Sequence, residues 1–496
     1  MLTYNLEKRG EQTLYGYLYE CIRSDILCGR ILPNEKLPSK RTLAKNMEIS
    51  VKTVENAYEQ LLVEGYVRAE EKRGYFVNAV EGRAAGNKSA GNPADGNMET
   101  GKEADMETGI NADRKAGIKT DMKVHGGNGH GKEEWFADFT SNYKVYEKFP
   151  FSTWAKIMRE TLSYHDMELL EMVPTLGIEP LREEIAKHLY EFRGMEVSPQ
   201  QIVVGAGTEY LYGRLIQLLG RDGIYALENP GYLKMTRLYK NHGLSYRYVD
   251  IDGNGIRLDA LRESGANVVH VSPGHHFPVG FVMPVARRQE LLNWAGEERG
   301  RYIIEDDYDS EFRLNVKPVP AMQTLDTDHR VIYLNTFSRT LFPSVRVGYM
   351  VLPPKLVERY LETVSFYSCS VSAVEQYALA SFMEKGYFER HIRRVKLYYK
   401  EKRDGLLAEL KRTPLWGKCT LIEENAGTRF LLRVDTPLTD SQIKWCAAGR
   451  GLNLSCLSEY CKGQTKETGG ILLISYGDIP KGRMREAVGR LSAVFG

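Results

Sequence analysis

The sequence predicts a multidomain protein: an N-terminal winged helix-turn-helix, followed by a larger α/β domain that carries a smaller α+β lobe. Three observations predict this organisation. A polar, glycine-rich segment divides the 496 residues, two capped helices and a short hairpin precede it, and apolar runs alternating with amphipathic stretches follow it. A chain of this length has room for two or three domains with separate cores.

Composition narrows the possible classes of protein. The formal charge of +2 and the 42% of apolar residues are typical of a globular protein, and they indicate no nucleic-acid or membrane partner by themselves. Seven cysteines without a Cys-x-x-Cys pair favour reduced thiols over a disulfide framework or a zinc site. With no apolar leader and no apolar stretch long enough to span a bilayer, we expect a cytoplasmic protein without membrane contact.

Residues 81–134 are rich in Gly, Asn, Lys, Asp and Glu and contain almost no side chain that fills a core. Such a segment cannot bury enough apolar surface to offset the entropy of ordering, so we expect a flexible linker. The predicted domains are therefore 1–80 and 135–496.

The first domain begins with apolar side chains at helical spacing over 14–26. Ser39 and Ser50 stand where N-caps are expected, each at the start of a further helix. Strand-like runs at 66–69 and 75–77 flank a turn that contains Gly74. Two short helices joined by a turn and followed by a hairpin predict a helix-turn-helix with a β-wing.

The segments 37–44, 49–61 and 64–66 resemble the GntR-type winged helix. In that family the second helix of the motif enters the major groove, and the wing approaches the minor groove. Carried over position by position, the resemblance implies these DNA-binding residues: Ser39, Arg41, Ser50, Lys52, Thr53, Lys72 and Arg73.

Lys52 departs from the arginine that this family usually has near this position. A lysine is a point charge without the planar fork needed for bidentate guanine recognition, so we expect phosphate contact there rather than base reading. Acidic and basic residues nearly balance in this domain, but the basic ones gather around the motif and the wing. Operator DNA is therefore favoured over a merely solvated helix face.

The second domain contains short apolar runs that predict a buried parallel or mixed sheet, at 202–204, 223–227, 268–271, 302–304, 331–334 and 347–351. A charged helix at 393–410 and strands at 427–434 and 470–475 predict the smaller lobe.

Motifs at 204–211, 228–232, 272–280, 304–312 and 336–346 resemble, in order, the fold type I aminotransferase scaffold. Together with the winged helix they resemble the MocR family of regulators. The resemblance implies nine cofactor-binding residues for pyridoxal phosphate: Gly207, Thr208, Tyr232, Asp306, Tyr308, Thr336, Ser338, Arg339 and Arg346.

The family assigns roles to several of these positions. Asp306 pairs with the pyridine nitrogen, Tyr308 contacts the ring phenolate, and hydroxyls of Thr336 and Ser338 meet the phosphate, which Arg346 clamps. The neighbouring His275 and His276 have no third ligand at a suitable spacing, so no metal site is expected.

Arg339 occupies the position of the lysine that holds pyridoxal phosphate as a Schiff base. A guanidinium stays protonated in proteins and cannot form that bond. A second departure lies in the strand 470–475, where Leu473 falls at the position of the family's carboxylate-binding arginine. Arg429 is a candidate replacement, although a surface or packing cation is its simpler interpretation.

The sequence therefore predicts a transcription regulator in which the aminotransferase-like domain dimerises, senses a small molecule and lacks transaminase activity. Pyridoxal phosphate is expected to bind non-covalently and weakly, if it binds. Two alternatives remain: a working aminotransferase that uses another lysine, and a partner-binding protein with a vestigial head. The operator sequence, the effector and the direction of regulation are not set by the sequence.

Overall fold

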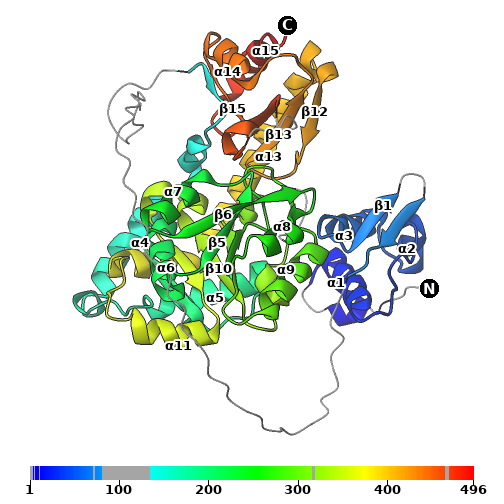
Figure 1. The fold of residues 1–496 in the computed structure, drawn as a ribbon. Helices are drawn as coiled ribbons and strands as arrows, with labels where there is room; N and C mark the ends of the chain where they lie inside the picture. Colours follow the sequence, from blue (N-terminus) through cyan, green and yellow to red (C-terminus); the bar gives the residue numbers. More distant parts are fainter. Residues whose placement is uncertain are drawn as a thin grey trace, which may run out of the picture. The chain divides into compact units, whose positions relative to one another are not determined.

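The computed structural model describes residues 4, 6–9, 12–70, 73–80, 135–314, 319–463 and 469–496 (Figure 1). The predicted linker 81–134 and Lys72 lie outside the described residues. The N-terminal domain contains α1 (Leu14–Leu27), α2 (Lys40–Asn46), α3 (Val51–Val63), β1 (Val67–Glu70) and β2 (Gly74–Val77). The strands β1 and β2 pair antiparallel, as a wing requires.

The core of this domain forms where α1 packs on α3. Leu18 and Ile22 of α1 and Val54, Ala57 and Leu61 of α3 are all fully buried. Helical spacing places each of these sets on one face of its helix, so the two apolar faces meet. The helices and the hairpin predicted for this domain are confirmed.

The large domain is built on an eight-stranded mixed sheet in the order β4-β11-β10-β9-β8-β5-β6-β7. Strands β10, β9, β8, β5 and β6 are parallel to their neighbours in this run, whereas β11 is antiparallel to both β10 and β4. The strands are β4 (Ile202–Gly205), β5 (Ile224–Asn229), β6 (Ser245–Asp252), β7 (Gly255–Ile256), β8 (Val268–Val271), β9 (Tyr302–Asp307), β10 (Val331–Thr336) and β11 (Gly348–Val351).

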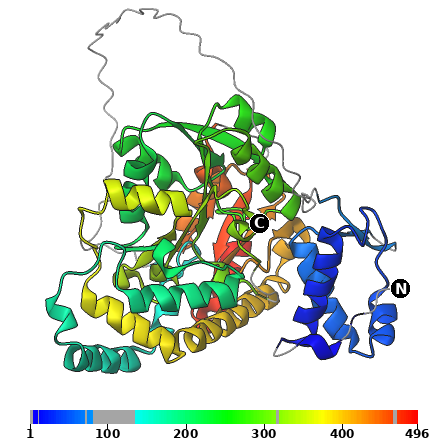
Figure 2. The same ribbon diagram turned by 90° about the horizontal axis from the view of Figure 1, so that it is seen from below.

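Helices cover both faces of this sheet (Figures 1 and 2). Alternate residues of β10 show how: Ile332 and Leu334 pack with α6, α7 and α11, whereas Val331 packs with α8 and α9 on the other face. Burial on both faces explains the near-continuous apolar runs in the strands. The helices are α4 (Phe151–Tyr164), α5 (Glu179–Arg193), α6 (Thr208–Leu219), α7 (Leu233–Asn241), α8 (Leu258–Glu263), α9 (Val285–Glu297), α10 (Phe337–Thr340), α11 (Pro354–Thr363) and α12 (Ala373–Glu384).

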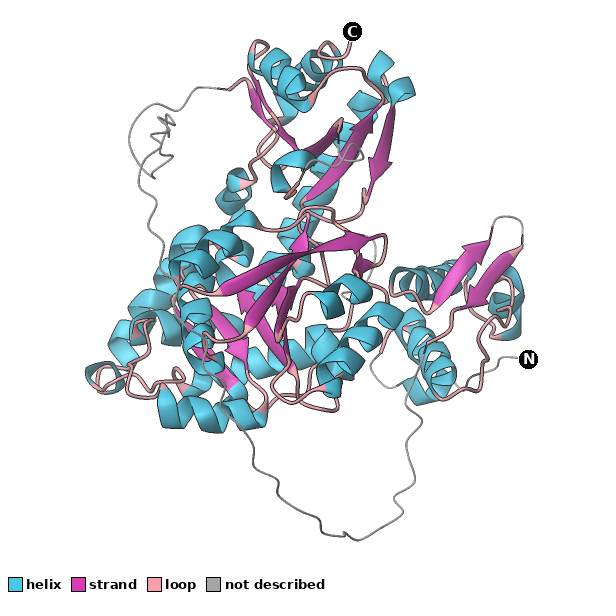
Figure 3. Ribbon diagram, viewed as in Figure 1, coloured by secondary structure: helices cyan, strands magenta, loops and turns pink. Residues whose placement is uncertain are grey.

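The smaller lobe has a four-stranded antiparallel sheet in the order β12-β13-β16-β15 (Figure 3). Its strands and helices, with the small pair β3 and β14, are β3 (Ala137–Asp138), α13 (Tyr387–Leu410), β12 (Cys419–Ile422), β13 (Arg429–Val434), α14 (Asp440–Ala448), β14 (Leu452–Asn453), β15 (Ser455–Cys456), β16 (Ile471–Ser475) and α15 (Met484–Ser492).

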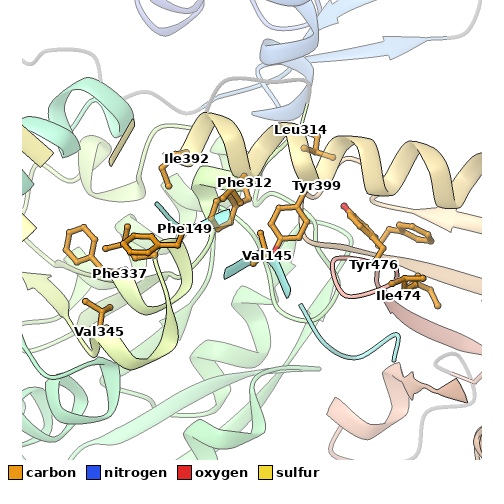
Figure 4. Close-up of a cluster of buried hydrophobic side chains, with 14 of the residues drawn as sticks. Val145, Phe149, Phe312, Leu314, Phe337, Val345, Ile392, Tyr399, Ile474 and Tyr476 are labelled. Atoms are coloured by element: carbon orange, nitrogen blue, oxygen red, sulfur yellow. The ribbon is translucent and has the colours of Figure 1, made fainter. Parts of the chain in front are cut away.

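A continuous apolar core joins the lobe to the large sheet along α13 (Figure 4). Ile392 and Tyr399 of α13 belong to the same buried cluster as Phe337 beside the large sheet and Ile474 and Tyr476 of the lobe. The lobe and the large sheet therefore share one hydrophobic core.

The predicted strands of the large domain and both predicted strands of the lobe are confirmed, and the sheet is mixed. Strand β6 was not predicted, because it lacks the continuous apolar run of the buried strands: its polar and apolar residues alternate, with one break, as in a strand that is partly exposed. Of the helices in the described part, none has the length and hydropathy needed to cross a membrane.

Candidate functional site

A cavity of about 150 Å³ lies at the carboxyl ends of the parallel strands β5, β8, β9 and β10, where ligands of α/β folds usually bind. Glu228, Ser272, Asp306 and Thr336 stand at or just beyond these ends. The structure brings six of the nine predicted cofactor residues together in its wall: Thr208, Tyr232, Asp306, Tyr308, Thr336 and Arg339.

Asp306 is held by one carboxylate oxygen and leaves the other without a partner. Its Oδ2 accepts a hydrogen bond from the Tyr212 hydroxyl at 3.0 Å, and that hydroxyl lies 2.8 Å from His270 Nε2. Within the described part of the chain, the buried Oδ1 has no hydrogen-bond partner. A buried acceptor of this kind is costly, and a protonated ring nitrogen in the cavity would satisfy it.

Tyr308 also presents an unsatisfied polar atom. Its buried hydroxyl has no partner in the described structure, and its ring stacks on His275 with 5.7 Å between centroids. Burial raises the pKa of Tyr308, so the phenol stays protonated and remains a hydrogen-bond donor. Tyr232 lies at the same cavity, with its ring centroid 5.4 Å from that of Phe277.

The predicted phosphate end lies where α6 and α10 begin. Gly207 precedes α6 at φ 87°, and a Cβ atom there would lie 2.5 Å from Nη2 of Arg346. The positive φ is the reason that the position needs glycine. Thr336 caps α10 by accepting from Ser338 N at 3.2 Å, and the buried Ser338 Oγ has no partner among the described atoms.

Glu209, which the sequence analysis overlooked, changes this end of the site. Its Oε2 accepts a hydrogen bond from Arg346 Nη2 at 2.6 Å, and its other oxygen accepts from Lys234. Burial raises the pKa of Glu209, but the bonds from Lys234 and Arg346 outweigh it and lower the pKa to about 2. An ionised acid thus holds the cation expected to clamp a phosphate. The sequence carries this signal as an acid two residues after Gly207.

Arg339 is exposed to solvent and lines the cavity. No hydrogen bond or ion pair of its guanidinium occurs within the residues that the structure describes. Desolvation lowers the pKa of Arg339, but the nearby Tyr146, Asp309 and Tyr308 raise it by more, so the pKa lies above its ordinary value. The group therefore stays a cation, as the sequence predicts.

A second cavity, of about 200 Å³, shares Arg339 and Phe277 with the first. Arg429 lines it opposite Ser475, its register partner on β16, and Leu473 lies on the same face two residues away. Arg429 is only 6% exposed and lies over the Phe277 ring, so of the two simpler interpretations the structure contradicts a surface cation and supports a packing cation. Strand register brings this arginine to the cavity wall.

The two histidines have structural partners. His275 Nδ1 pairs with Asp309, and His276 stacks on Phe281 with 4.6 Å between centroids. Among the described residues, no group of three or more His, Cys, Asp or Glu side chains is arranged to hold a metal ion.

Glu228 is a buried acid in the cavity wall. Its Oε2 accepts from Ser272 N at 3.2 Å. Burial raises its pKa from 4.5 to about 8, and nearby Asp306 adds to the rise. An acid whose pKa is raised by folding stabilises the fold fully below pH 4.5, and that contribution is lost as the pH rises through about 8.

We therefore expect Glu228→Gln to reduce the loss of thermal stability between pH 6 and pH 9. The native Tm should fall by several degrees more over this range, because ionising a buried carboxyl costs a few kcal/mol at most. Differential scanning fluorimetry measures the effect. Glu263→Gln, at an exposed position on α8, is the control. An equal fall in all three proteins would show that Glu228 is already ionised in the folded state.

The DNA-binding head presents its predicted serines as helix caps. Ser39 Oγ accepts from Thr42 N at 3.1 Å, and Ser50 Oγ accepts from Thr53 N at 3.0 Å. Both predicted caps are confirmed. Capping stabilises the first turns of α2 and α3. The exposed residues of these turns remain accessible to a binding partner.

The basic residues of the head differ in whether an acidic side chain already binds them. Arg41 is exposed and makes no ion pair or hydrogen bond within the described chain. Lys40 and Lys52 each donate to a different oxygen of Glu55, both at 2.8 Å. These bonds lower the pKa of Glu55 to about 2. Glu55, which the sequence analysis did not single out, therefore competes with any phosphate for Lys52.

In the wing, Arg73 pairs with Glu70 at 2.5 Å and lies over the Phe76 ring at 5.4 Å. Both contacts are at the exposed end of the hairpin.

Comparisons with known proteins decide the family. Residues 14–77 match the family described as bacterial regulatory proteins of the gntR family, and residues 138–444 match aminotransferase class I and II. "Uncharacterized HTH-type transcriptional regulator YdeL" of Bacillus subtilis is 33% identical over 97% of this chain and 96% of that one. "Probable rhizopine catabolism regulatory protein MocR" of Rhizobium meliloti is 32% identical, over 99% and 95% of the two chains. The chain belongs to the MocR family.

Two solved structures show the fold of this MocR-family domain. A multiple substrate aminotransferase from Thermococcus profundus has a TM-score of 0.63 at 25% identity, and a kynurenine aminotransferase from Pyrococcus horikoshii has 0.62 at 23%. Each match covers 73% of this chain and 91% of the other. The MocR-family chain therefore joins a winged helix to a fold type I aminotransferase domain, as predicted.

Proposed function

We propose that this MocR-family chain is a cytoplasmic transcription regulator whose winged helix binds operator DNA and whose aminotransferase-like domain senses a small molecule without catalysing transamination. The observation that carries the proposal is Arg339. It lines the cavity, and its guanidinium stays protonated. The motif resemblance assigns it to the position of the family's cofactor lysine. A domain that keeps the cavity but lacks the amine is suited to binding rather than turnover.

The cavity fits non-covalent recognition of pyridoxal phosphate. Two lining atoms without a partner in the described chain match its groups, Asp306 Oδ1 the ring nitrogen and Tyr308 OH the phenolate oxygen. Ser338 Oγ, at the start of α10, is likewise without a partner there and matches the phosphate. When bound, the cofactor supplies an aldehyde and an electron-withdrawing ring. Glu209 opposes a phosphate near Arg346, and Arg339 offers no covalent anchor. We therefore expect pyridoxal phosphate to bind weakly, and to act as a recognised ligand and not as a catalytic cofactor.

The proposal is tested with native protein and DNA from the promoter beside its own coding sequence. Fluorescence anisotropy should show binding that survives an excess of unrelated DNA, and a coupled assay should show no amino-group transfer after addition of pyridoxal phosphate. Turnover of an amino donor by the native chain would contradict the proposal. So would equal affinity for promoter and unrelated DNA.

The active form is proposed to be a homodimer, which lets two heads engage paired half-sites. Exposed apolar side chains at the end of α4 and just after it support a second copy as the partner: Leu162, Tyr164, Met167, Leu170 and Met172. Large exposed apolar side chains that gather in one segment often mark an interface.

We expect the double substitution of Leu170 and Met172 by aspartate to convert the dimer to a monomer and to weaken operator binding at least tenfold, because the second half-site is lost. Both side chains are 83% exposed, so the fold of one chain should tolerate the change. Native mass spectrometry measures subunit number. Trp445→Asp on α14, at another exposed apolar side chain, is the control. A dimer that persists in the double variant would place the interface elsewhere.

A further inference from the structure

The second cavity contains two guanidinium groups whose donors are unused. Arg339 makes no hydrogen bond or ion pair in the described chain, and Arg429 makes no hydrogen bond there. Arg429 forms a loose ion pair with Asp309, with 3.9 Å between Nη2 and Oδ2. Arg429 is buried and Arg339 is exposed at the cavity, and an anionic ligand there would supply acceptors to both guanidinium groups.

The charge around this cavity is positive. Among the described residues that line it, Arg339 and Arg429 are cations and none is an acid. Asp309 lies behind Arg429, and His275 and the Thr428 hydroxyl, at 3.1 Å, already occupy its oxygens. Burial raises the pKa of Asp309, but His275 and Arg429 lower it overall, so Asp309 carries one negative charge against two positive ones.

The remaining wall is suited to an organic ligand. Phe277, Tyr460 and Leu473 contribute aromatic and apolar surface, and Arg429 lies over the Phe277 ring at 4.7 Å from the centroid. A stacked guanidinium is held in one plane, which preserves its fork for a planar carboxylate. Inorganic phosphate would match the charges but would leave this apolar surface uncovered.

We propose that the second cavity binds a small carboxylic acid through Arg339 and Arg429, without any covalently attached cofactor. The carboxylate is the effector class of the regulator proposed above, and this step rests on that function. Arg339 serves as an anion ligand in place of a catalytic amine. Arg429 brings the second cation to the same sheet face as Leu473, from the neighbouring strand.

The test uses the full chain, dialysed free of pyridoxal phosphate, and succinate as the probe in isothermal titration calorimetry. We expect succinate to bind the native protein and to bind at least about tenfold more weakly after Arg429→Gln or Arg339→Gln, because each loses charge-assisted hydrogen bonds. Arg433→Gln, an exposed arginine on the same strand β13, should bind like the native protein. Arg429→Lys keeps the charge but not the fork, and should lie between.

Operator binding by each variant reports that it is folded and separates this inference from the proposed regulator. Native protein that binds DNA but not succinate would overturn the carboxylate site and leave the regulator standing. If Arg429→Gln binds succinate as tightly as the native protein does, succinate does not bind in the second cavity. Inorganic phosphate or neutral succinamide binding as tightly as succinate would overturn recognition of a carboxylate.

Discussion

Replacing Arg41 and Lys52 together by alanine is expected to weaken operator binding on the order of a hundredfold, since each contact of this kind contributes about 1–3 kcal/mol. Both residues lie at the exposed beginnings of the motif's helices, where the family places its DNA contacts. Arg41 has no competing acid, whereas Lys52 is paired with Glu55. The single change Arg41→Ala should therefore cost more than Lys52→Ala.

Fluorescence anisotropy over a series of salt concentrations measures this loss, and the double variant should show a flatter salt dependence because fewer phosphates are neutralised. Lys355→Ala, at an exposed lysine on α11, is the matched control. Glu55→Gln supplies a change in the opposite direction: it frees Lys40 and Lys52, so affinity should rise. Native affinity in the folded double variant would remove these residues from the interface and favour a vestigial head.

Much of the winged helix could be predicted from the sequence, because its helix caps depend only on residues close in the chain. A cap such as Ser39 acts on the first turn of its own helix, so a few neighbouring letters determine it. The Lys40–Glu55 bond joins residues 15 positions apart on two helices. Its existence depends on how α2 packs against α3, which the periodicity of either helix does not specify. The charge balance at the proposed DNA surface therefore needed the structure.

The two cavities differ in the same way: the first follows from motifs along the chain, and the second depends on how strands pair. Motifs in chain order predicted most of the first one, because parallel strands deliver their carboxyl ends to one edge of the sheet. Arg429 reaches the second cavity only through the register that pairs it with Ser475. A shift of one residue would place it on the other face of the lobe's sheet. Sequence alone left its burial open for that reason.

Arg339→Lys is expected to gain what the native chain lacks, a covalent bond to pyridoxal phosphate. A lysine here would share the wall of the second cavity with Arg429, and a neighbouring cation favours the neutral form of its amine. The amine condenses with the cofactor aldehyde and releases water. The variant should show a new visible absorbance band that borohydride abolishes, and intact-mass spectrometry should find one cofactor per chain. Native protein should show neither.

Two further variants test whether the covalent bond requires the new amine and the Asp306 carboxylate. Arg339→Gln removes the charge without adding an amine, so it should resemble the native protein. Asp306→Ala in the Arg339→Lys background removes the carboxylate proposed to meet the ring nitrogen, and cofactor occupancy at a fixed concentration should fall about tenfold or more. An adduct in the native chain would contradict the role assigned to position 339. If Arg339→Lys folds and binds DNA yet gains no adduct, the cavity is not a cofactor site, because its one missing reactive group would have been restored without effect.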